Sequence, residues 1–389
     1  LDLYDPDRAR ESFRRKDNGE DGLSWSGVDT NSLIAEISEW TKEGKFAILA
    51  DRSFSLARTK LSGELKNKGV QLFEYEAIDL ARPEKLLSQG LGLDSDGMRA
   101  IPNLGKVKRA LSLDCDFLGS REPFALANTR SFMGGRKVSS PGDAKKMNRL
   151  YSVESDMTLT GGVADHRLRL DPSQIPAFAF LLAAEVISVR KGDQTLAERL
   201  KELGETAESH RDWIAPCVAD LCSKPSQSIV LAGSHLPEEV QVAAFLINHS
   251  LGAIGKTIHY LPTNDEHGGI SDLIKKIEDG EIENLLFLGG NPVFLTGSFV
   301  DWDRLRKKLK KVARMGYSID ESSEYSDLHV AQSHYLESWD LSGTWDEATI
   351  VPVQPLIAPL FDTASDLELL LSLIGSSQSA HDLVKAMHS

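Results

Sequence analysis

Short apolar segments alternate with longer amphipathic segments along most of the chain, and this alternation most constrains the fold. Phe46–Ala50, Arg109–Leu113, Ser228–Ala232 and Asn284–Leu288 are four of the apolar segments. Each is followed by a stretch with helical spacing, and strands separated by helices of this length form parallel βαβ crossovers. The sequence therefore predicts an α/β fold with parallel sheets covered by helices on both faces.

Further strands are expected at 70–75, 149–154, 312–319 and 327–331, and helices at 57–68 and 175–190. A chain of 389 residues favours two domains. Linker-like stretches at 91–104 and 192–209 predict two Rossmann-like lobes, one inserted into the other. The predicted boundaries are an extended arm at 1–29, a first lobe at 30–100 with 205–375, an inserted lobe at 101–200, and a tail at 376–389.

Composition excludes some classes of partner. The formal charge of −14 argues against a nucleic-acid partner and against an anionic membrane surface, since both attract basic patches. The longest apolar run, 175–189, falls short of the roughly 20 residues of a membrane span and contains Pro176 and Glu185. We expect no membrane span, and no signal-peptide pattern opens the chain. Cys115, Cys217 and Cys222 have neither disulfide nor cluster spacing, and we expect them to be small core residues.

Two glycine-containing junctions follow predicted strands, where parallel sheets bind ligands. Gly233, Ser234 and His235 follow the strand at 228–232. They either hold a phosphate or form a strand–helix turn that Ser234 caps. Gly289, Gly290 and Asn291 follow the strand at 284–288. A nucleotide or pterin would fit against them, but a plain turn needs the same residues.

Other polar groups give no clear reaction centre. Asp114 and Asp116 end the strand at 109–113, and helix capping or a salt bridge is the favoured role over ion binding. His329, His334 and Glu337 are the nearest approach to a metal-ligand group, but their spacing matches no established motif. No G-x-S-x-G elbow is present. We therefore predict no catalytic and no metal-binding residue in this chain.

A series of short phrases nevertheless occurs in a recognisable order, at 3–8, 24–25, 113–119, 147–154, 159–161, 164–167, 233–240, 248–252, 255–257, 290–292, 334–339 and 354–359. They include D-x-D-F-L-G at 114–119 and A-D-H-R at 164–167. Each phrase is short, but together they cover nearly the whole chain. In this order they resemble the molybdopterin-oxidoreductase-like region of the iron–sulfur subunit of alternative complex III.

The resemblance implies two lobes like the middle domains of formate dehydrogenase and DMSO reductase. It implies a quinol-oxidising electron-transfer complex at the outer face of the bacterial cytoplasmic membrane, with other subunits and a ferredoxin-like region as partners. Iron–sulfur clusters would lie in that region, outside this chain. Gly233, Ser234, His235, Glu154 and the loop Gly289-Gly290-Asn291 would map onto loops that hold guanosine diphosphate arms of molybdopterin guanine dinucleotide in active relatives.

The departures from this pattern shape the functional prediction. No cysteine precedes Cys115, and we expect the N-terminal cluster ligands and the C-terminal cofactor-covering domain to be missing. We expect a non-catalytic scaffold without a cofactor of its own, and Trp302, Trp339 and Trp345 as partner or domain-interface anchors. One alternative is a fragment of an oxidoreductase that still binds molybdopterin guanine dinucleotide. Another is a two-lobed small-molecule binding protein. Whether the chain has activity by itself stays open.

Overall fold

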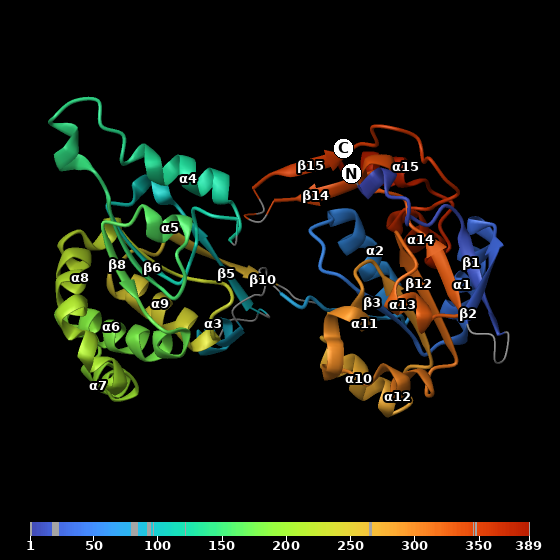
Figure 1. The fold of residues 1–389 in the computed structure, drawn as a ribbon, viewed down its shortest axis with the longest axis horizontal. Coiled ribbons are helices and arrows are strands. Elements are labelled where there is room, and N and C mark those ends of the chain that lie inside the picture. Colours follow the sequence, from blue (N-terminus) through green and yellow to red (C-terminus); the bar gives the residue numbers. More distant parts are fainter. Residues whose placement is uncertain are drawn as a thin grey trace. The chain divides into compact units, whose positions relative to one another are not determined.

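The computed structural model describes residues 2–17, 23–78, 85–91, 95, 97–120, 122–263, 267–344, 346 and 348–388. The chain divides into two compact units (Figure 1). Unit 1 comprises Leu1–Ala77 and His267–Ser389, and unit 2 comprises Ile78–Glu266. Unit 2 is therefore an insertion in unit 1, and each unit has its own sheet and its own core.

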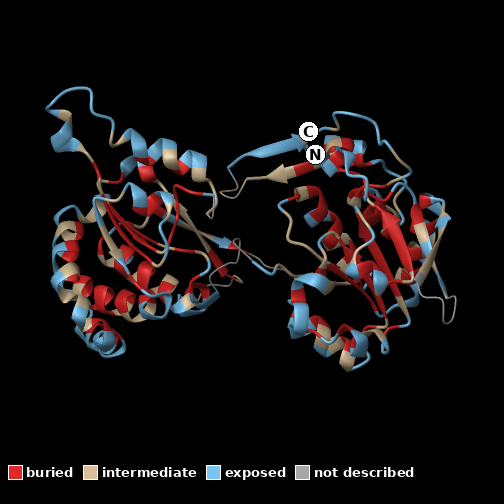
Figure 2. Ribbon diagram, viewed as in Figure 1, coloured by how far each residue is buried: buried red, intermediate tan, exposed pale blue. Residues whose placement is uncertain are grey.

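Unit 1 is built on a seven-stranded sheet. In spatial order its strands are β2 (Leu23–Val28), β1 (Ser12–Asp17), β13 (Leu328–Ala331), β12 (Lys311–Gly316), β11 (Asn284–Leu288), β3 (Phe46–Ala50) and β4 (Gln71–Glu74). From β13 to β4 neighbouring strands are parallel, while β1 pairs antiparallel with both β13 and β2. The central strands are continuous apolar runs because helices cover both faces (Figure 2).

The helices of unit 1 form two cores, one on each face of its sheet. They are α1 (Thr30–Glu43), α2 (Leu56–Asn67), α10 (Ile270–Glu278), α11 (Pro292–Thr296), α12 (Trp302–Arg306), α13 (Glu321–Glu324), α14 (Asp366–Leu373) and α15 (Ala380–His388). Leu33 and Ile37 of α1 contribute to the core that α2, α14 and α15 share. Leu273 and Ile277 of α10 contribute to the other. Asp29 begins α1 by accepting the N–H of Ser32 at 2.9 Å.

An antiparallel hairpin, β14 (Asp340–Gly343) and β15 (Ile350–Val353), completes unit 1. It is attached to the segment before α2, because the N–H of Gly343 donates to the carbonyl of Phe54 at 2.9 Å. Short 3-10 turns in the two units are η1 (Asp2–Tyr4), η3 (Leu104–Lys106), η4 (Asp143–Lys146), η5 (Pro172–Gln174), η6 (Glu205–His210), η7 (Pro225–Gln227), η8 (Gly297–Phe299) and η9 (Tyr335–Glu337).

Unit 2 contains a four-stranded parallel sheet and a separate two-stranded ribbon. The sheet has the order β8 (His166–Arg169), β7 (Arg149–Glu154), β6 (Arg109–Leu113) and β9 (Ser228–Ala232), and the antiparallel ribbon pairs β5 (Gly97–Pro102) with β10 (Ile258–Thr263). Its helices are α3 (Lys85–Gly90), α4 (Ala125–Gly134), α5 (Leu159–Gly162), α6 (Ile175–Val189), α7 (Gln194–Leu203), α8 (Arg211–Ser223) and α9 (Glu238–Ser250).

Helix α6 supplies the centre of the unit 2 core. The segment Pro172–Val189 has the length and apolar composition of a membrane-spanning helix. Phe178, Leu182 and Val186 are nevertheless fully buried among other core side chains. A helix that is apolar nearly all round is typical of a protein interior as well as of a membrane, and packing in unit 2 accounts for this composition.

The predicted α/β class with parallel sheets is confirmed, but the domain boundaries differ from the predicted ones. Residues 12–17 and 23–28 are not an arm, because β1 and β2 extend the unit 1 sheet. The segment 205–266 belongs to unit 2, because β9 pairs with β6 and β10 pairs with β5. The predicted tail contains α15, whose Leu383 and Val384 are buried.

The expected roles of the tryptophans also change. Trp302 is a core residue of α12 that is 4% exposed and packs edge-on against Phe287. Its indole N–H donates to the Thr296 hydroxyl at 2.8 Å. Trp339 packs against the core of unit 1, with its ring 4.8 Å from that of His381. Trp345 lies outside the described residues.

Candidate functional site

The loops after β6, β7 and β9 meet at the carboxyl edge of the unit 2 sheet. Asp114 follows β6, and its carboxylate accepts the N–H of Ser155 at 3.3 Å in the loop after β7. The other oxygen of the carboxylate lies 3.4 Å from Nε2 of His235 in the loop after β9. The structure therefore brings the predicted residues Gly233, Ser234 and His235 close to the loop that follows Glu154.

Gly233 is required by the close approach of two loops. A Cβ atom at this position would lie 2.3 Å from the carbonyl oxygen of Asp114. The N–H of Gly233 donates to the carbonyl of Leu113 at 2.9 Å. This glycine thus serves the packing of the loop after β9 against the loop after β6.

The backbone N–H of Ser234 is occupied by a carboxylate. It donates to Oε1 of Glu122 at 3.0 Å, and the Ser234 hydroxyl lies 3.4 Å from the same oxygen. Burial raises the pKa of Glu122, and the nearby Asp116 raises it further. Ser234 does not cap α9, since the N-cap position is Pro237 and has no side-chain cap. The capping interpretation of Ser234 is therefore wrong.

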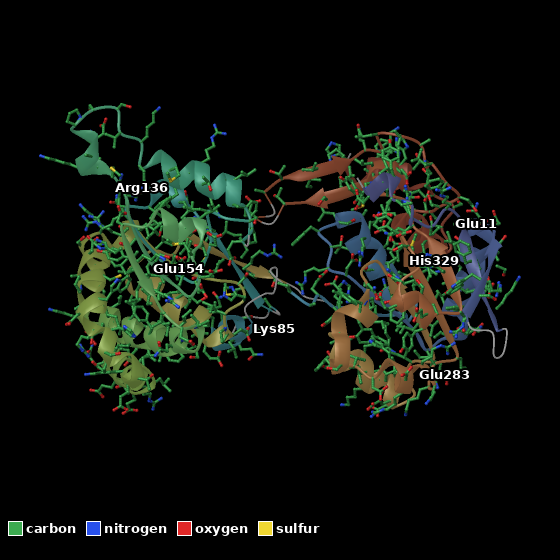
Figure 3. The ribbon with its side chains drawn as sticks, in the orientation of Figure 1. Glu11, Lys85, Arg136, Glu154, Glu283 and His329 are labelled. Carbon is green, nitrogen blue, oxygen red and sulfur yellow. The ribbon has the colours of Figure 1, made fainter. Side chains whose placement is uncertain are left out.

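Glu154 is a buried ion-pair partner at the end of β7 (Figure 3). Its side chain accepts hydrogen bonds from Nε of Arg167 at 2.5 Å and from the Thr158 hydroxyl at 2.6 Å. Gly161 of α5 lies so close that a Cβ atom there would be 1.7 Å from Oε1. Glu154 fixes α5 and β8 against the end of β7.

The two aspartates after β6 are also fully engaged. Asp116 accepts the N–H and the hydroxyl of Thr160 at 2.9 and 2.8 Å, which is the capping type of role expected for it. Burial raises the pKa of Asp114, but hydrogen bonds from His235 and Ser155 outweigh that effect and lower it overall. This edge of the sheet thus carries carboxylates from several loops, offset by Arg167 and His235.

The second predicted loop lies at the carboxyl edge of the unit 1 sheet. Gly289 and Gly290 both have positive φ, of 69° and 50°. A Cβ atom on Gly289 would lie 2.7 Å from the Asp51 carboxylate. Buried Arg314 donates to the carbonyl of Gly289 at 2.8 Å and to that of Gly290, and it pairs with Asp320 at 2.8 Å. The loop is held from inside the protein by this guanidinium.

Asn291 begins the short helix α11. Its side-chain oxygen accepts the Phe294 N–H at 3.4 Å and the Ser322 hydroxyl at 2.6 Å, while its amide nitrogen donates to Glu321 at 2.7 Å. These bonds correspond to the turn interpretation of this junction. They commit the asparagine side chain to the protein itself.

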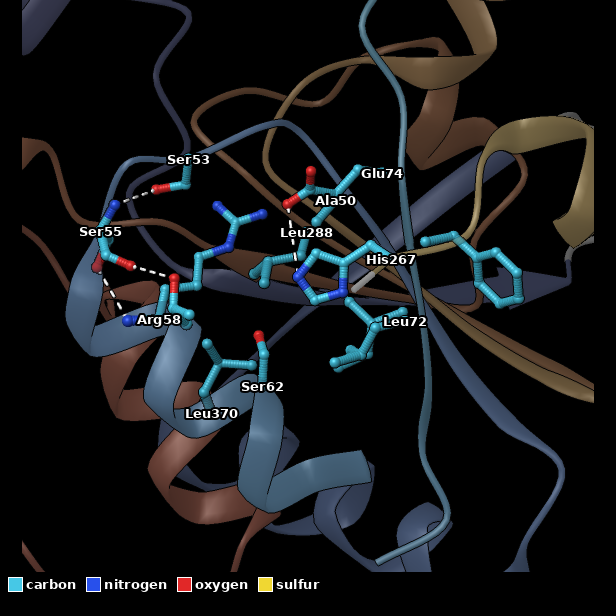
Figure 4. A pocket seen from close by; sticks show the side chains of 13 residues that line it. Ala50, Ser53, Ser55, Arg58, Ser62, Leu72, Glu74, His267, Leu288 and Leu370 are labelled. Carbon is cyan, nitrogen blue, oxygen red and sulfur yellow. Dashed lines mark hydrogen bonds and ion pairs between the residues drawn. The ribbon is translucent and has the colours of Figure 1, made fainter. Parts of the chain in front are cut away.

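A pocket that the sequence did not indicate lies beside this loop (Figure 4). Its cavity volume is about 20 Å³, close to the space that one water molecule needs, and it is bordered by Ser53, Ser55, Arg58, Glu74 and His267 over an aliphatic floor. The His267 ring faces Glu74, with Nε2 3.7 Å from its carboxylate. Arg58 donates to the Asp51 carboxylate at 2.9 Å. In the sequence, Ser53 and Ser55, which precede α2, are the residues that could have indicated this pocket.

The histidines that came nearest to a metal-ligand pattern have structural roles. His329 lies buried in β13, with Nδ1 3.0 Å from the Ser323 hydroxyl. His334 and Glu337 form the N-terminal capping box of η9, and Glu337 pairs with buried Arg8. Among the residues that the structure describes, no group of three or more His, Cys, Asp or Glu could hold a metal ion.

Comparison with known proteins gives evidence on the fold. No protein-family model matches the chain, and no curated protein matches it in sequence. Acetylene hydratase from Pelobacter acetylenicus is similar in structure, with a TM-score of 0.73 over 100% of this chain and 65% of that chain, at 10% sequence identity. This chain therefore spans about 65% of the length of that protein.

A second structure is the formyltransferase/hydrolase complex (FhcABCD) from Methylorubrum extorquens in complex with methylofuran. Its TM-score is 0.47 at 13% identity, over 94% of this chain and 98% of that chain, which is too low to support an argument. The likeness to acetylene hydratase extends over the whole chain and shows a shared fold. The chain therefore has an α/β fold like that of acetylene hydratase.

Proposed function

We propose that the chain is a non-catalytic, molybdopterin-oxidoreductase-like scaffold within a respiratory electron-transfer complex of the alternative complex III type. The fold and the ordered phrases from 3–8 to 354–359 support this assignment. A fold alone does not carry an activity, because function depends on the site. The proposal therefore rests on what the strand ends of the two units are able to bind.

One observation carries the proposal: the Glu122 carboxylate occupies the N–H of Ser234 at 3.0 Å. A phosphate at this junction would need such free backbone donors. It would also have to approach the carboxylates of Asp114 and Asp116 at the same edge, which repel it. The residues present do not fit the diphosphate of a molybdopterin guanine dinucleotide.

The loop in unit 1 supports the same conclusion. Arg314 bonds the carbonyls of Gly289 and Gly290 from the protein interior, and the Asp51 carboxylate lies against Gly289. A carboxylate on this loop disfavours an anionic ligand. Asn291 is already bonded to Ser322 and Glu321. We propose that Gly233, Ser234, His235, Glu154 and this loop are vestiges of a cofactor site and now stabilise the two units.

The remaining parts of the proposal come from the resemblance. We propose that the chain holds no cofactor of its own and that iron–sulfur clusters lie in a ferredoxin-like region. Its partners would be that region and the other subunits of the complex, at the outer face of the bacterial cytoplasmic membrane. The overall charge of −14 supports protein partners over nucleic acid.

The first test is elemental analysis together with nucleotide release, on protein purified from its native source. The scaffold role predicts molybdenum, tungsten and guanine nucleotide far below one equivalent per chain. Either metal with guanine nucleotide near one equivalent would overturn it in favour of the alternative, a dinucleotide-binding oxidoreductase fragment.

Calorimetric titration with guanosine diphosphate tests the blocking carboxylate directly. We expect no detectable binding to the wild-type protein. Glu122→Ala removes the carboxylate that occupies the Ser234 N–H, and Glu198→Ala, on the exposed face of α7, removes the same group elsewhere. Tight binding by the wild-type protein, with no change in either variant, would contradict the proposed blocking.

A further inference from the structure

The strand β4 forms one edge of the unit 1 sheet, and an open pocket lies against it. β4 pairs with β3 on one side, and among the described residues no strand pairs with it on the other. The pocket has a cavity volume of about 480 Å³, which is within the range of ligand pockets. Residues 69–73 line it, together with Lys66, Gly268, Asp272 and Lys276. We call it the edge pocket.

Backbone groups of β4 point towards the edge pocket. The N–H of Glu74 donates to the carbonyl of Gly268 at 2.9 Å, and the N–H of Gly268 donates to the carbonyl of Leu72 at 3.2 Å. The N–H of Tyr75 instead donates to the carbonyl of Ala50 in β3, at 3.1 Å. Successive residues of β4 thus turn their backbone groups to opposite sides of the strand, as in any parallel ladder. The N–H of Leu72 therefore faces the edge pocket.

Gly268 shows that the position beside β4 accepts an extended backbone. It forms an isolated parallel bridge with Phe73, and its N–H and carbonyl bond β4 as a residue of a neighbouring strand does. The edge pocket extends from this bridge along residues 69–72. An exposed strand edge is a template for a further strand, because it offers main-chain hydrogen bonds. The edge pocket is therefore suited to an extended peptide segment.

Two lysines give the edge pocket its charge preference. Lys66 lies in the last turn of α2 and Lys276 in the last turn of α10, and these helices pack on opposite faces of the sheet. Lys276 donates to the amide oxygen of Gln71 on β4 at 2.6 Å and lies 3.7 Å from exposed Glu281. The Asp272 carboxylate is engaged in capping α10. Side chains alternate between the two faces along a strand, so two consecutive carboxylates of an added strand would point towards the two lysines.

We propose that the edge pocket binds an extended segment of a partner protein, which carries two consecutive carboxylate side chains and adds a strand beside β4. Main-chain bonds such as one from the N–H of Leu72 supply affinity, and the lysines on the two faces select acidic side chains. A second copy of this chain is a poorer occupant, because each copy carries a formal charge of −14 and two copies repel one another. The inference does not depend on the proposed loss of cofactor binding, since the residues of that proposal do not line the edge pocket.

Fluorescence anisotropy with a labelled, end-blocked hexapeptide tests the proposal. The acidic peptide Thr-Val-Glu-Glu-Val-Thr is expected to bind the full chain saturably, with a Kd of about 1 mM or tighter, whereas the basic peptide Thr-Val-Lys-Lys-Val-Thr should not bind. Amide hydrogen exchange at Leu72 should slow when the acidic peptide is present. Failure of the acidic peptide to bind, or equal binding of the basic peptide, would overturn the proposal.

Leu72→Pro distinguishes backbone pairing from side-chain packing. It removes the N–H that faces the edge pocket, and proline is tolerated on an edge strand when its nitrogen points outward. Leu72→Ala is the matched control, because it shortens the same side chain and keeps the N–H. We expect the proline variant to bind the acidic peptide at least about tenfold more weakly than the alanine variant. Equal Kd values in the two variants would exclude strand addition. Circular dichroism checks that both remain folded.

The charge preference has its own test, which holds even if Leu72→Pro fails to fold. Lys66→Glu combined with Lys276→Glu should weaken binding of the acidic peptide at least about tenfold. Lys307→Glu combined with Lys308→Glu, at exposed positions after α12, makes the same change of charge elsewhere and should leave the Kd unchanged. An unchanged Kd in the first double variant would overturn the proposal. A wild-type dimer in sedimentation velocity that Leu72→Pro abolishes would assign the edge pocket to a second copy and overturn it as well.

Discussion

The carboxylate of Glu122 accepts the backbone N–H of Ser234 at 3.0 Å, across 112 positions of sequence. This bond connects the segment after β6 to the loop after β9 at the carboxyl edge of the unit 2 sheet. It occupies a donor that an anionic ligand would need. The bond therefore links the packing of unit 2 to the proposed loss of cofactor binding.

Replacement of Glu122 by Gln should stabilise the protein at neutral pH. Burial raises the pKa of Glu122 above its ordinary value of 4.5, so its stabilising contribution is complete below that value and is lost as pH rises through the raised pKa. Glutamine keeps an acceptor for Ser234 without the buried charge. We expect a gain on the order of 1 kcal/mol at neutral pH that disappears below about pH 4.5.

Urea unfolding at both pH values measures this difference. Glu198→Gln, on the exposed face of α7, is the control and should change stability little at either pH. Equal or lower stability of Glu122→Gln at neutral pH would show that the charge itself strengthens the bond to Ser234.

Gly161→Ala should destabilise unit 2, while Gly162→Ala should not. A Cβ atom on Gly161 would lie 1.7 Å from the buried Glu154 carboxylate, whereas one on Gly162 would meet nothing within 4 Å. We expect a loss of at least about 2 kcal/mol for the first variant and less than about 0.5 kcal/mol for the second. Both glycines belong to α5, so helix propensity affects them alike.

The free energy of unfolding from urea titration distinguishes the two alanine variants. Similar values for both would mean that α5 moves away from β7 at little cost. Glu154 would then not hold α5 in a fixed position against the end of β7.

The sequence predicted those parts of the fold that continuous burial determines. Phe46–Ala50, Arg109–Leu113 and Asn284–Leu288 were predicted to the residue, because they are short, mainly apolar segments between covered faces. The strand β1 was missed because its sequence Ser-Phe-Arg-Arg-Lys-Asp has no such run. It lies near an edge of the sheet, where charged side chains are common.

The candidate site was predictable only in part, for a related reason. Parallel strands end at one edge, so the junctions at 233–235 and 289–291 could be predicted from local sequence. The side chains that bond the backbone of these junctions could not be predicted in this way. Glu122 reaches Ser234 across 112 positions, and Arg314 reaches the Gly289 carbonyl across 25. Such contacts depend on tertiary packing, which no local pattern encodes.

Arg314→Met should cost about 3–5 kcal/mol of stability, because it leaves a half-buried carboxylate without its partner. Arg314 is 3% exposed and bonds Asp320 together with the carbonyls of Gly289 and Gly290. Burial raises the pKa of Asp320, but the bond from Arg314 outweighs this and lowers it. The variant should therefore raise that pKa.

Thermal unfolding compared with Arg304→Met tests this role. Arg304 is largely exposed on α12 and pairs with Glu278, so its loss should cost less than about 1 kcal/mol. Comparable losses in the two variants would mean that the Gly289–Asn291 loop keeps its conformation without the buried guanidinium.

Buried His329 should make unit 1 sensitive to acid. Burial, followed by the charge of Arg314, lowers the pKa of His329 to about 4, while Asp320 partly opposes them (Figure 3). The ring is neutral in the folded protein, so its contribution to stability is complete above its ordinary pKa of 6.5 and is lost as pH falls towards 4. The full loss amounts to about 3 kcal/mol.

His329→Gln should flatten this part of the stability profile even if its stability at neutral pH is lower. His259→Gln, at an exposed position on β10, should leave the profile unchanged. Urea unfolding at several pH values between 7 and about 4.5 measures the slopes, and parallel profiles for wild-type protein and His329→Gln would assign the acid sensitivity to other groups.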